Sequence, residues 1–246
     1  MTELKPVRQL NLAQTSAIVI GTVIGSGIFI NLPIVARIAG SPGLATMIWL
    51  VGGIFWIPQI LLLAEMGTAY PDQGFAYDYL KRAGSPFLAF LYTWTAFLTS
   101  DTPSLTIIAL SASSALSFFV PGLSSPLYAK SFAIGLIMVL TLIHLRSVQG
   151  GGNFQIFFTI AKIAPLILLV VIGMAYLGSG KFFMSPEPGF IEPHGWLGVL
   201  VGGISATVWS YAGFGNILYM AGEVKNPGRT LPIALIGSLV FVMVSY

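Results

Sequence analysis

Cysteine is absent from this sequence, which excludes a disulfide framework and a thiolate metal site. Charge is scarce as well, because only 8% of the 246 residues are Asp, Glu, Lys or Arg. Soluble domains carry about 25% charged residues, so this chain has too few charges to cover a surface in water. Hydrophobic residues make up 56% of the chain, and the two values together indicate a protein that crosses a membrane several times.

The sequence lacks the residues that several classes of function require. An intramembrane enzyme would need a nucleophile with a base or a metal cluster, but the chain has no cysteine, and His144 and His194 lie far apart. Neither histidine belongs to a His-Glu-x-x-His motif. The basic residues occur singly or in pairs, unlike the patches of a nucleic-acid surface. We therefore expect no enzymatic activity, no metal, no cofactor and no nucleic-acid partner. A channel stays open as an alternative.

Long uncharged runs divide the chain into segments of membrane-spanning length. A bilayer core of about 30 Å needs about 20 apolar residues per helix. On this basis the sequence predicts an all-α membrane protein with about seven transmembrane helices. They are expected at 9–36, 42–64, 86–120, 127–145, 154–177, 196–221 and from 231 onward.

Basic residues in the predicted loops indicate how these spans are oriented. With the amino terminus in the cytoplasm, seven basic residues lie on the cytoplasmic side and three on the opposite side. Because Lys and Arg are enriched in cytoplasmic loops, we expect residues 1–11 to be a cytoplasmic tail of an inner- or plasma-membrane protein. The cytoplasmic set is Lys5, Arg8, Lys81, Arg82, Arg146, Lys225 and Arg229, and the opposite set is Arg37, Lys130 and Lys181.

The last predicted span is short and has no polar residues after it. A chain that ended within the membrane would bury its carboxylate, which is expensive. We therefore expect a fragment or an early-terminated product of a longer transporter, with a missing carboxy-terminal half or an oligomer partner. A short, tilted last helix is the alternative.

Glycines weaken the middle of the first and the sixth predicted spans. Gly21, Gly25 and Gly27 lie in GTVIGSGIF, and Gly213 and Gly215 lie in WSYAGFGN. Each glycine inside a helix costs about 1 kcal/mol relative to alanine. Two interrupted spans at corresponding positions are typical of inverted-repeat transporters, whereas close helix packing is the alternative for the first span alone. The pattern predicts a first repeat at 12–180 and an incomplete second repeat at 181–246.

An unwound segment inside a membrane helix exposes backbone groups of both polarities. N–H groups are free at the start of one half-helix and C=O groups at the end of the other. The N–H end attracts a carboxylate, and the C=O end attracts an ammonium. Both ends in one small cavity fit the two charged groups of a free amino acid.

Three motifs together resemble the amino acid–polyamine–organocation (APC) superfamily of amino acid permeases. They are GTVIGSGIF at 21–29, PDQGFAYDYLKRAGSPFLAFLYTW at 71–94, and WSYAGFGN at 209–216 followed by GEVKNPGRTLP at 222–232. In the second motif, Phe75 stands where the family usually has the second glycine of Pro-x-x-Gly-Gly-x-Tyr. The resemblance implies a LeuT-type inverted-repeat helical bundle in which helices one and six are discontinuous.

The resemblance also implies an activity. It implies secondary active transport of amino acids by alternating access, as sodium-independent exchange or proton symport. A basic amino acid/polyamine antiporter and a non-transporting half-permease are the alternatives. The implied substrate-binding residues contribute mainly backbone groups. The substrate carboxylate would accept from the N–H groups of Gly25, Ser26 and Gly27. The substrate ammonium would donate to the carbonyls of Val23 or Ile24 and to those of Trp209, Ser210 and Ala212. Trp209 is the implied aromatic gate, and Ala212 and Gly213 border the side-chain pocket.

Two charged residues, Asp101 and Lys162, lie deep within predicted spans, where a charge is costly unless it is paired or solvated. The resemblance implies that Lys162 substitutes for a sodium ion and reaches carbonyls near Gly21 and Thr22; snorkelling to the interface is the alternative. Asp101 precedes Pro103. It either binds a cationic substrate side chain, a coupling proton or Lys162, or caps a helix break.

Overall fold

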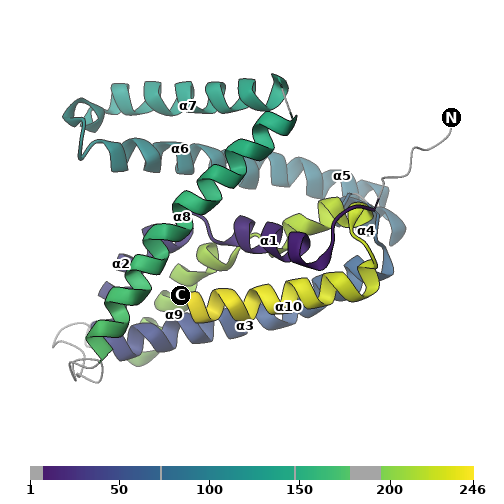
Figure 1. Cartoon of the computed structure of the whole chain (residues 1–246), viewed down its shortest axis with the longest axis horizontal. Coiled ribbons are helices and arrows are strands. Elements are labelled where there is room, and N and C mark those ends of the chain that lie inside the picture. Colours follow the sequence, from purple (N-terminus) through teal and green to yellow (C-terminus); the bar gives the residue numbers. More distant parts are fainter. Residues whose placement is uncertain (1–7, 73, 147, 178–194) are drawn as a thin grey trace. The chain divides into compact units, whose positions relative to one another are not determined.

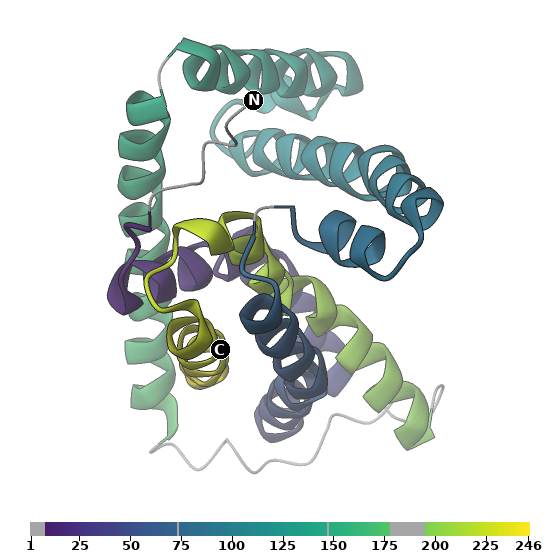
Figure 2. The same ribbon diagram turned by 90° about the vertical axis from the view of Figure 1, so that its right-hand side faces the viewer.

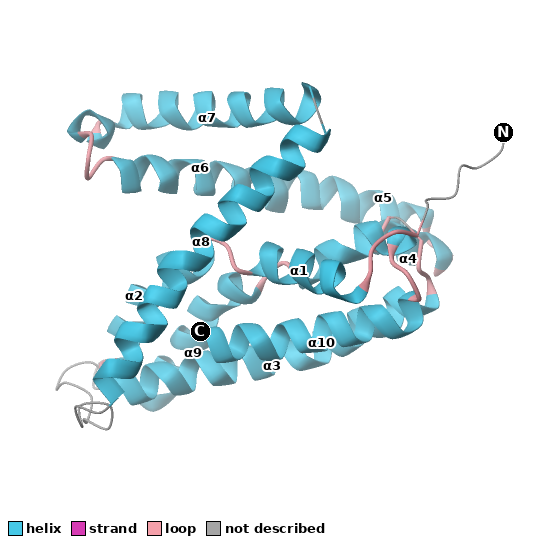
Figure 3. Cartoon of the chain, viewed as in Figure 1, coloured by secondary structure: helices cyan, strands magenta, loops and turns pink. Residues whose placement is uncertain are grey.

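Helices make up most of the part of the chain that is described. The computed structural model describes residues 8–72, 74–146, 148–177 and 195–246. Figure 3 shows helices and loops in these ranges and no strand. The backbone divides into two compact units, one made of residues up to 79 and from 162 onward, the other of residues 80–161.

The first unit contains both interrupted spans together with two long helices. Its elements are α1 (Leu12–Val23), α2 (Ser26–Ala39), α3 (Pro42–Ala69), the start of α4 (Ala76–Arg82), the carboxy-terminal part of α8 (Val148–Leu177), α9 (Gly195–Val208), the 3₁₀ segments η4 (Trp209–Tyr211) and η5 (Phe214–Glu223), and α10 (Pro227–Ser245).

The start of α1 is set by a local sequence signal. The Asn11 side chain accepts from the Gln14 backbone N–H at 3.0 Å, and the Gln14 side chain accepts from the Asn11 N–H at 3.1 Å. This reciprocal arrangement satisfies N–H groups that a helix start would otherwise leave free. The helix therefore begins directly after the predicted tail at 1–11.

Packing in the first unit centres on α3 and α10, which lie side by side (Figure 1). Leu231, Leu235 and Val242 of α10 are fully buried, and α1 packs on the same helix. Figure 2 shows α9 beside α3. Outward-facing positions are apolar too, as Phe55 of α3 is 67% exposed. Helices that are apolar on all sides fit a lipid environment.

The second unit is built around an antiparallel pair of helices, α6 and α7, which pack together (Figure 1). Its elements are the end of α4, α5 (Pro86–Thr95), the π-helical turn η1 (Ala96–Asp101), α6 (Thr102–Leu116), the 3₁₀ turn η2 (Pro121–Ser124), α7 (Pro126–Arg146) and the start of α8.

The π-helical turn has a visible cause. Pro103 has no N–H, and its ring would clash with the carbonyl four residues earlier in a regular helix. The Thr102 backbone N–H and hydroxyl both donate to the Phe97 carbonyl instead, the hydroxyl at 2.7 Å. The helix thus widens for one turn and continues, so the predicted third span is present as α5, η1 and α6.

Four helices in the described residues are long and apolar enough to cross a membrane: Pro42–Ala69, Pro126–Ile143, Gly195–Glu223 and Pro227–Ser245. A fifth span is formed by α1 and α2 together, which meet at a bend of 49°. Two further predicted spans correspond to the run from α5 to α6 and to the apolar helix Ala161–Ala175 within α8. The proposed repeat boundary at 180 and 181, with Lys5 and Lys181, lies outside the described residues.

Candidate functional site

The first span is interrupted two residues after Thr22. α1 ends at Val23, Ile24 and Gly25 leave the helical conformation, and α2 begins at Ser26. Gly25 is the residue before the first turn of α2 and has no side chain, so it cannot cap the N–H groups that follow it. A methyl group on Gly25 would come no closer than 3.8 Å to the Val23 carbonyl oxygen. A side chain at Gly25 would therefore meet open space, and the first N–H groups of α2, which have no partner within the helix, lie at the positive end of its dipole.

The sixth span is interrupted in a second way. α9 tightens into the 3₁₀ turn η4, Ala212 is extended (φ −73°, ψ 151°), and Gly213 has a φ of +119°. This φ is left-handed, and a side chain there would be strained. The span continues as η5, a 3₁₀ helix of 10 residues, although 3₁₀ runs longer than three or four residues are uncommon.

The two interruptions lie against each other. A methyl group on Gly213 would come within 3.0 Å of the Thr22 carbonyl oxygen, and the Thr22 hydroxyl lies 3.3 Å from the Gly213 oxygen to which it donates. A methyl group on Gly27 would come within 2.9 Å of Cδ1 of Trp209. Glycine is therefore required at Gly213 and Gly27, where the two interrupted spans approach each other, whereas the space around Gly25 does not require it.

A buried hydrogen bond also joins the two spans. The Asn31 side-chain amide donates to the Ser210 hydroxyl at 3.1 Å, and both residues are buried. Asn31 was not among the residues expected at the site. Its signal was a single amide residue in the apolar run after Ser26, because polar residues inside spans face protein rather than lipid.

Only some of the last carbonyls of α1 keep a partner at the end of their own helix, and the others meet side chains from elsewhere in the chain. The Ile20 carbonyl accepts from the Ile24 N–H. The Gly21 carbonyl accepts from Nζ of Lys162 at 2.5 Å, so the lysine reaches the segment expected for it. The Val23 carbonyl faces the Tyr246 hydroxyl at 3.5 Å.

One carbonyl from each interruption lies close to the hydroxyl of Tyr246. This hydroxyl donates to the Ser210 carbonyl at 3.1 Å and lies 3.5 Å from that of Val23. Two carbonyls from residues far apart in sequence therefore converge. Nothing in the sequence marked Tyr246, because only the packing of α10 carries its ring to this point.

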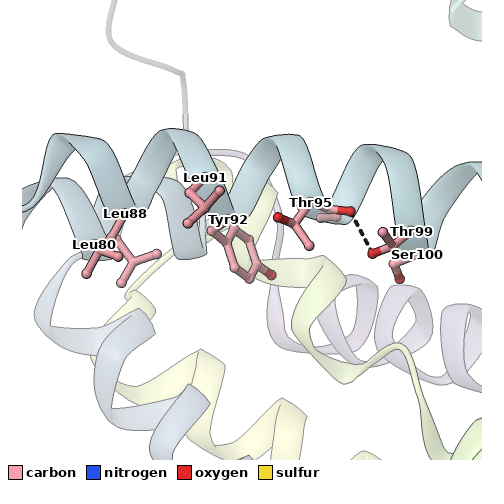
Figure 4. A pocket seen from close by; sticks show the side chains of 8 residues that line it. Leu80, Leu88, Leu91, Tyr92, Thr95, Thr99 and Ser100 are labelled. Carbon is pink, nitrogen blue, oxygen red and sulfur yellow. Dashed lines mark hydrogen bonds between the residues drawn. The ribbon is translucent and has the colours of Figure 1, made fainter.

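Asp101 belongs to the second unit and is exposed at the end of η1. The alternative that it caps a helix break is wrong, because its backbone is helical (φ −71°, ψ −48°) and its side chain makes no capping hydrogen bond. Pro103 explains why, since the helix widens there without breaking. Beside η1 lies a hollow with the side chains of Tyr92, Thr95 and Thr99 along it (Figure 4).

The helical fold and the paired interruptions define a class: an all-α, multi-pass membrane protein with the helical fold of APC transporters. Comparison with known families agrees, because the family model described as "Amino acid permease" matches residues 10–246 of this sequence. The chain therefore belongs to the amino acid permease family, whose members are permeases and not enzymes.

Individual relatives match nearly the whole chain. It is 32% identical over 256 residues to the mouse b(0,+)-type amino acid transporter 1, covering 100% of this chain and 51% of the relative. It is 30% identical over 245 residues to the serine/threonine exchanger SteT of Bacillus subtilis, covering 97% and 53%. It is 29% identical over 252 residues to the mouse large neutral amino acids transporter small subunit 2, covering 97% and 46%. The chain spans about half the length of these curated relatives.

Proposed function

We propose that this chain forms the amino acid-binding part of a secondary active transporter that works by alternating access. The observation that carries the proposal is the convergence of the Val23 and Ser210 carbonyls, one from each interrupted span, on a single donor. The family match and the names of the relatives support amino acids as the substrate class.

The substrate carboxylate binds at the start of α2. The N–H groups of Gly25, Ser26 and Gly27 are the donors, and the helix dipole contributes roughly half a positive charge there. The open space around Gly25 supports this assignment, because a ligand atom needs room that a packed helix end does not leave.

The substrate ammonium binds at the carbonyl ends on the other side of each interruption. Its acceptors are the carbonyls of Val23 or Ile24 and those of Trp209, Ser210 and Ala212. Trp209, which is 43% exposed, is the aromatic gate. Ala212 and Gly213 border the space for the substrate side chain.

Lys162 takes the place of a coupling sodium ion. Its ammonium on the Gly21 carbonyl supplies a fixed positive charge at the negative end of α1. Transport is therefore sodium-independent and runs as exchange or proton symport. Lys162→Met leaves the α1 carbonyls without this charge, and we expect amino acid binding to weaken at least tenfold with or without sodium. Unchanged binding in Lys162→Met, or wild-type transport that requires sodium, would argue against this assignment.

A second candidate is a basic amino acid/polyamine antiporter. The observation that favours it is Asp101, whose carboxylate is exposed and is not used as a cap. Asp101→Asn would then weaken binding of L-arginine strongly and binding of L-leucine little.

The experiment that tests the proposal is ligand binding to the purified chain in detergent, measured as the shift of its thermal unfolding midpoint. A ligand at 100 times its dissociation constant stabilises the folded state by about 2.7 kcal/mol. We expect L-leucine, L-serine or L-arginine to raise the midpoint, and D-glucose to leave it unchanged. No shift with any amino acid at millimolar concentration would overturn the proposal.

Uptake into proteoliposomes separates a carrier from a channel. A carrier saturates and shows counterflow, whereas a channel passes current without saturating. The chain spans about half the length of its relatives. Uptake that needs co-reconstitution with a carboxy-terminal half or a second copy, while binding does not, would identify a half-permease.

A further inference from the structure

We propose that the Tyr246 hydroxyl occupies the ammonium end of the amino acid site and competes with the substrate ammonium for the same two carbonyls. This inference rests on the proposed function and deepens it. Tyr246 is then a built-in occupant of the site that sets how tightly an amino acid binds, and it is not a contact that holds the substrate.

The distances place the hydroxyl where an ammonium would sit. The oxygen lies 3.1 Å from the Ser210 carbonyl oxygen and 3.5 Å from that of Val23. An N–H···O hydrogen bond spans 2.7–3.2 Å between heavy atoms, so an ammonium bound to both carbonyls would overlap the hydroxyl oxygen. The two groups cannot hold this position together.

The hydroxyl is there because the carbonyls need a donor. Val23 ends α1 and is 3% exposed, and Ser210 lies in η4 and is fully buried. Buried carbonyls without a partner are costly, above all in a membrane where water is scarce. The phenol of Tyr246 supplies one O–H to this pair, and a substrate ammonium would supply three charged N–H donors.

The ring is held from two sides, so the hydroxyl has a defined position. The Tyr246 ring meets Trp49 edge-on, with centroids 5.5 Å apart and an angle of 75° between planes. It also packs on Tyr211 at 5.3 Å. α10 brings it there by packing along α3 and α1 (Figure 1). An arriving ammonium has to displace a hydroxyl that is already hydrogen-bonded.

Removal of the hydroxyl therefore strengthens binding. One hydrogen bond of this kind is worth, in net terms, about a two- to tenfold change in an equilibrium constant. We expect Tyr246→Phe to bind L-leucine or L-serine two- to tenfold more tightly than the wild type. The same variant should unfold at a lower temperature without ligand, because its carbonyls lose their donor.

A matched control comes from the neighbouring phenol. The Tyr211 hydroxyl donates to the Trp49 carbonyl of α3 at 2.9 Å and not to a carbonyl of either interruption. Tyr211→Phe also removes a buried hydroxyl from the same aromatic cluster. It should lower the unfolding temperature without strengthening ligand binding.

The experiment measures dissociation constants for the wild type, Tyr246→Phe and Tyr211→Phe in detergent, from unfolding midpoints over a range of ligand concentrations. L-Leucine is compared with 4-methylpentanoate, and L-serine with 3-hydroxypropanoate, which are the same acids without the ammonium. The gain in Tyr246→Phe should appear for the amino acids and be absent for the acids. Tyr246→Leu, which also lacks the hydroxyl, replaces Tyr246→Phe if that variant does not fold.

Unchanged or weaker amino acid binding in the Tyr246 variants would overturn the inference and leave the proposed function standing. An equal gain for the acids without ammonium would overturn it as well, since competition would then not occur at the ammonium end. Failure of every protein, wild type included, to bind any amino acid would overturn the proposed function itself.

Discussion

At the scale of single residues, the glycines of the two interruptions are not equivalent. Gly213 has a left-handed φ of +119° and lies against the Thr22 carbonyl. Gly25 has a φ of −120° and open space around it. The sequence presents both as glycines in the middle of apolar spans, yet only Gly213 has a backbone conformation that disfavours any side chain.

Gly213→Ala should therefore destabilise the protein by about 1–3 kcal/mol, the range for a strained backbone conformation. Gly25→Ala is the matched control, because the added methyl meets no atom closer than 3.8 Å. Its unfolding midpoint should stay near that of the wild type. Thermal unfolding in detergent compares the two, and equal losses would contradict the geometry described for these glycines.

Phe75 stands where the family usually has glycine, and it adopts a φ of +49°. Its ring lies so close to Gly215 that an added methyl would come within 2.9 Å of Cζ. The ring also meets Tyr219 edge-on at 5.1 Å. Aromatic packing against η5 thus offsets the strain of the left-handed backbone conformation at Phe75.

Substitutions of Phe75 should reverse the usual order of alanine and glycine. Both Phe75→Ala and Phe75→Gly lose the ring and should lower the unfolding midpoint. Glycine is normally worse than alanine, but at a positive φ it avoids the strain that alanine keeps. We expect Phe75→Gly to be the more stable of the two by about 0.5–1 kcal/mol. A lower midpoint for Phe75→Gly would show that the left-handed conformation does not persist.

At the scale of elements, the buried Asn31–Ser210 hydrogen bond ties α2 to η4. It is the kind of contact that keeps two half-helices in register while their ends stay open. A buried polar group that loses its partner costs about 1–3 kcal/mol. Each interruption is therefore held in place by contacts with the other span as well as by its own helix.

A double-mutant cycle measures this tie. Asn31→Ala and Ser210→Ala should each lower the free energy of unfolding by about 1–3 kcal/mol, because each leaves a buried partner unsatisfied. The double variant should lose about 0.5–1.5 kcal/mol less than the sum of the two. Additive losses would mean that the two side chains do not interact.

At the scale of the whole molecule, the chain is a multi-pass membrane protein whose orientation rests on loop charges. We propose that the amino terminus is cytoplasmic. The loop at 121–125 then lies on the opposite side, because three spans separate it from the tail.

Protease accessibility tests this orientation in intact cells or right-side-out vesicles. An epitope fused to the amino terminus should resist external protease. The same epitope inserted between Ser124 and Ser125, at the end of η2, should be cleaved. The reverse pattern would invert the topology and with it the side on which Lys81, Arg82 and Arg229 lie.

Much of the architecture was predictable because its signals are local. Scarce charge and long apolar runs determine that the chain crosses a membrane, and each of the seven predicted runs is mainly helical where it is described. The glycine clusters at 21–27 and 213–215 marked where two helices stop, because backbone conformation depends on the residue itself. The family motifs led to the same conclusion from the order of short patterns.

Tertiary structure alone decided what those interrupted helices meet. The hydrogen bond between Asn31 and Ser210 and the approach of Tyr246 to Val23 and Ser210 join residues far apart in sequence. The sequence indicated open backbone groups at each interruption. Which donors reach them depends on how α10 packs against α3 and α1, and a local sequence pattern carries no information about this packing.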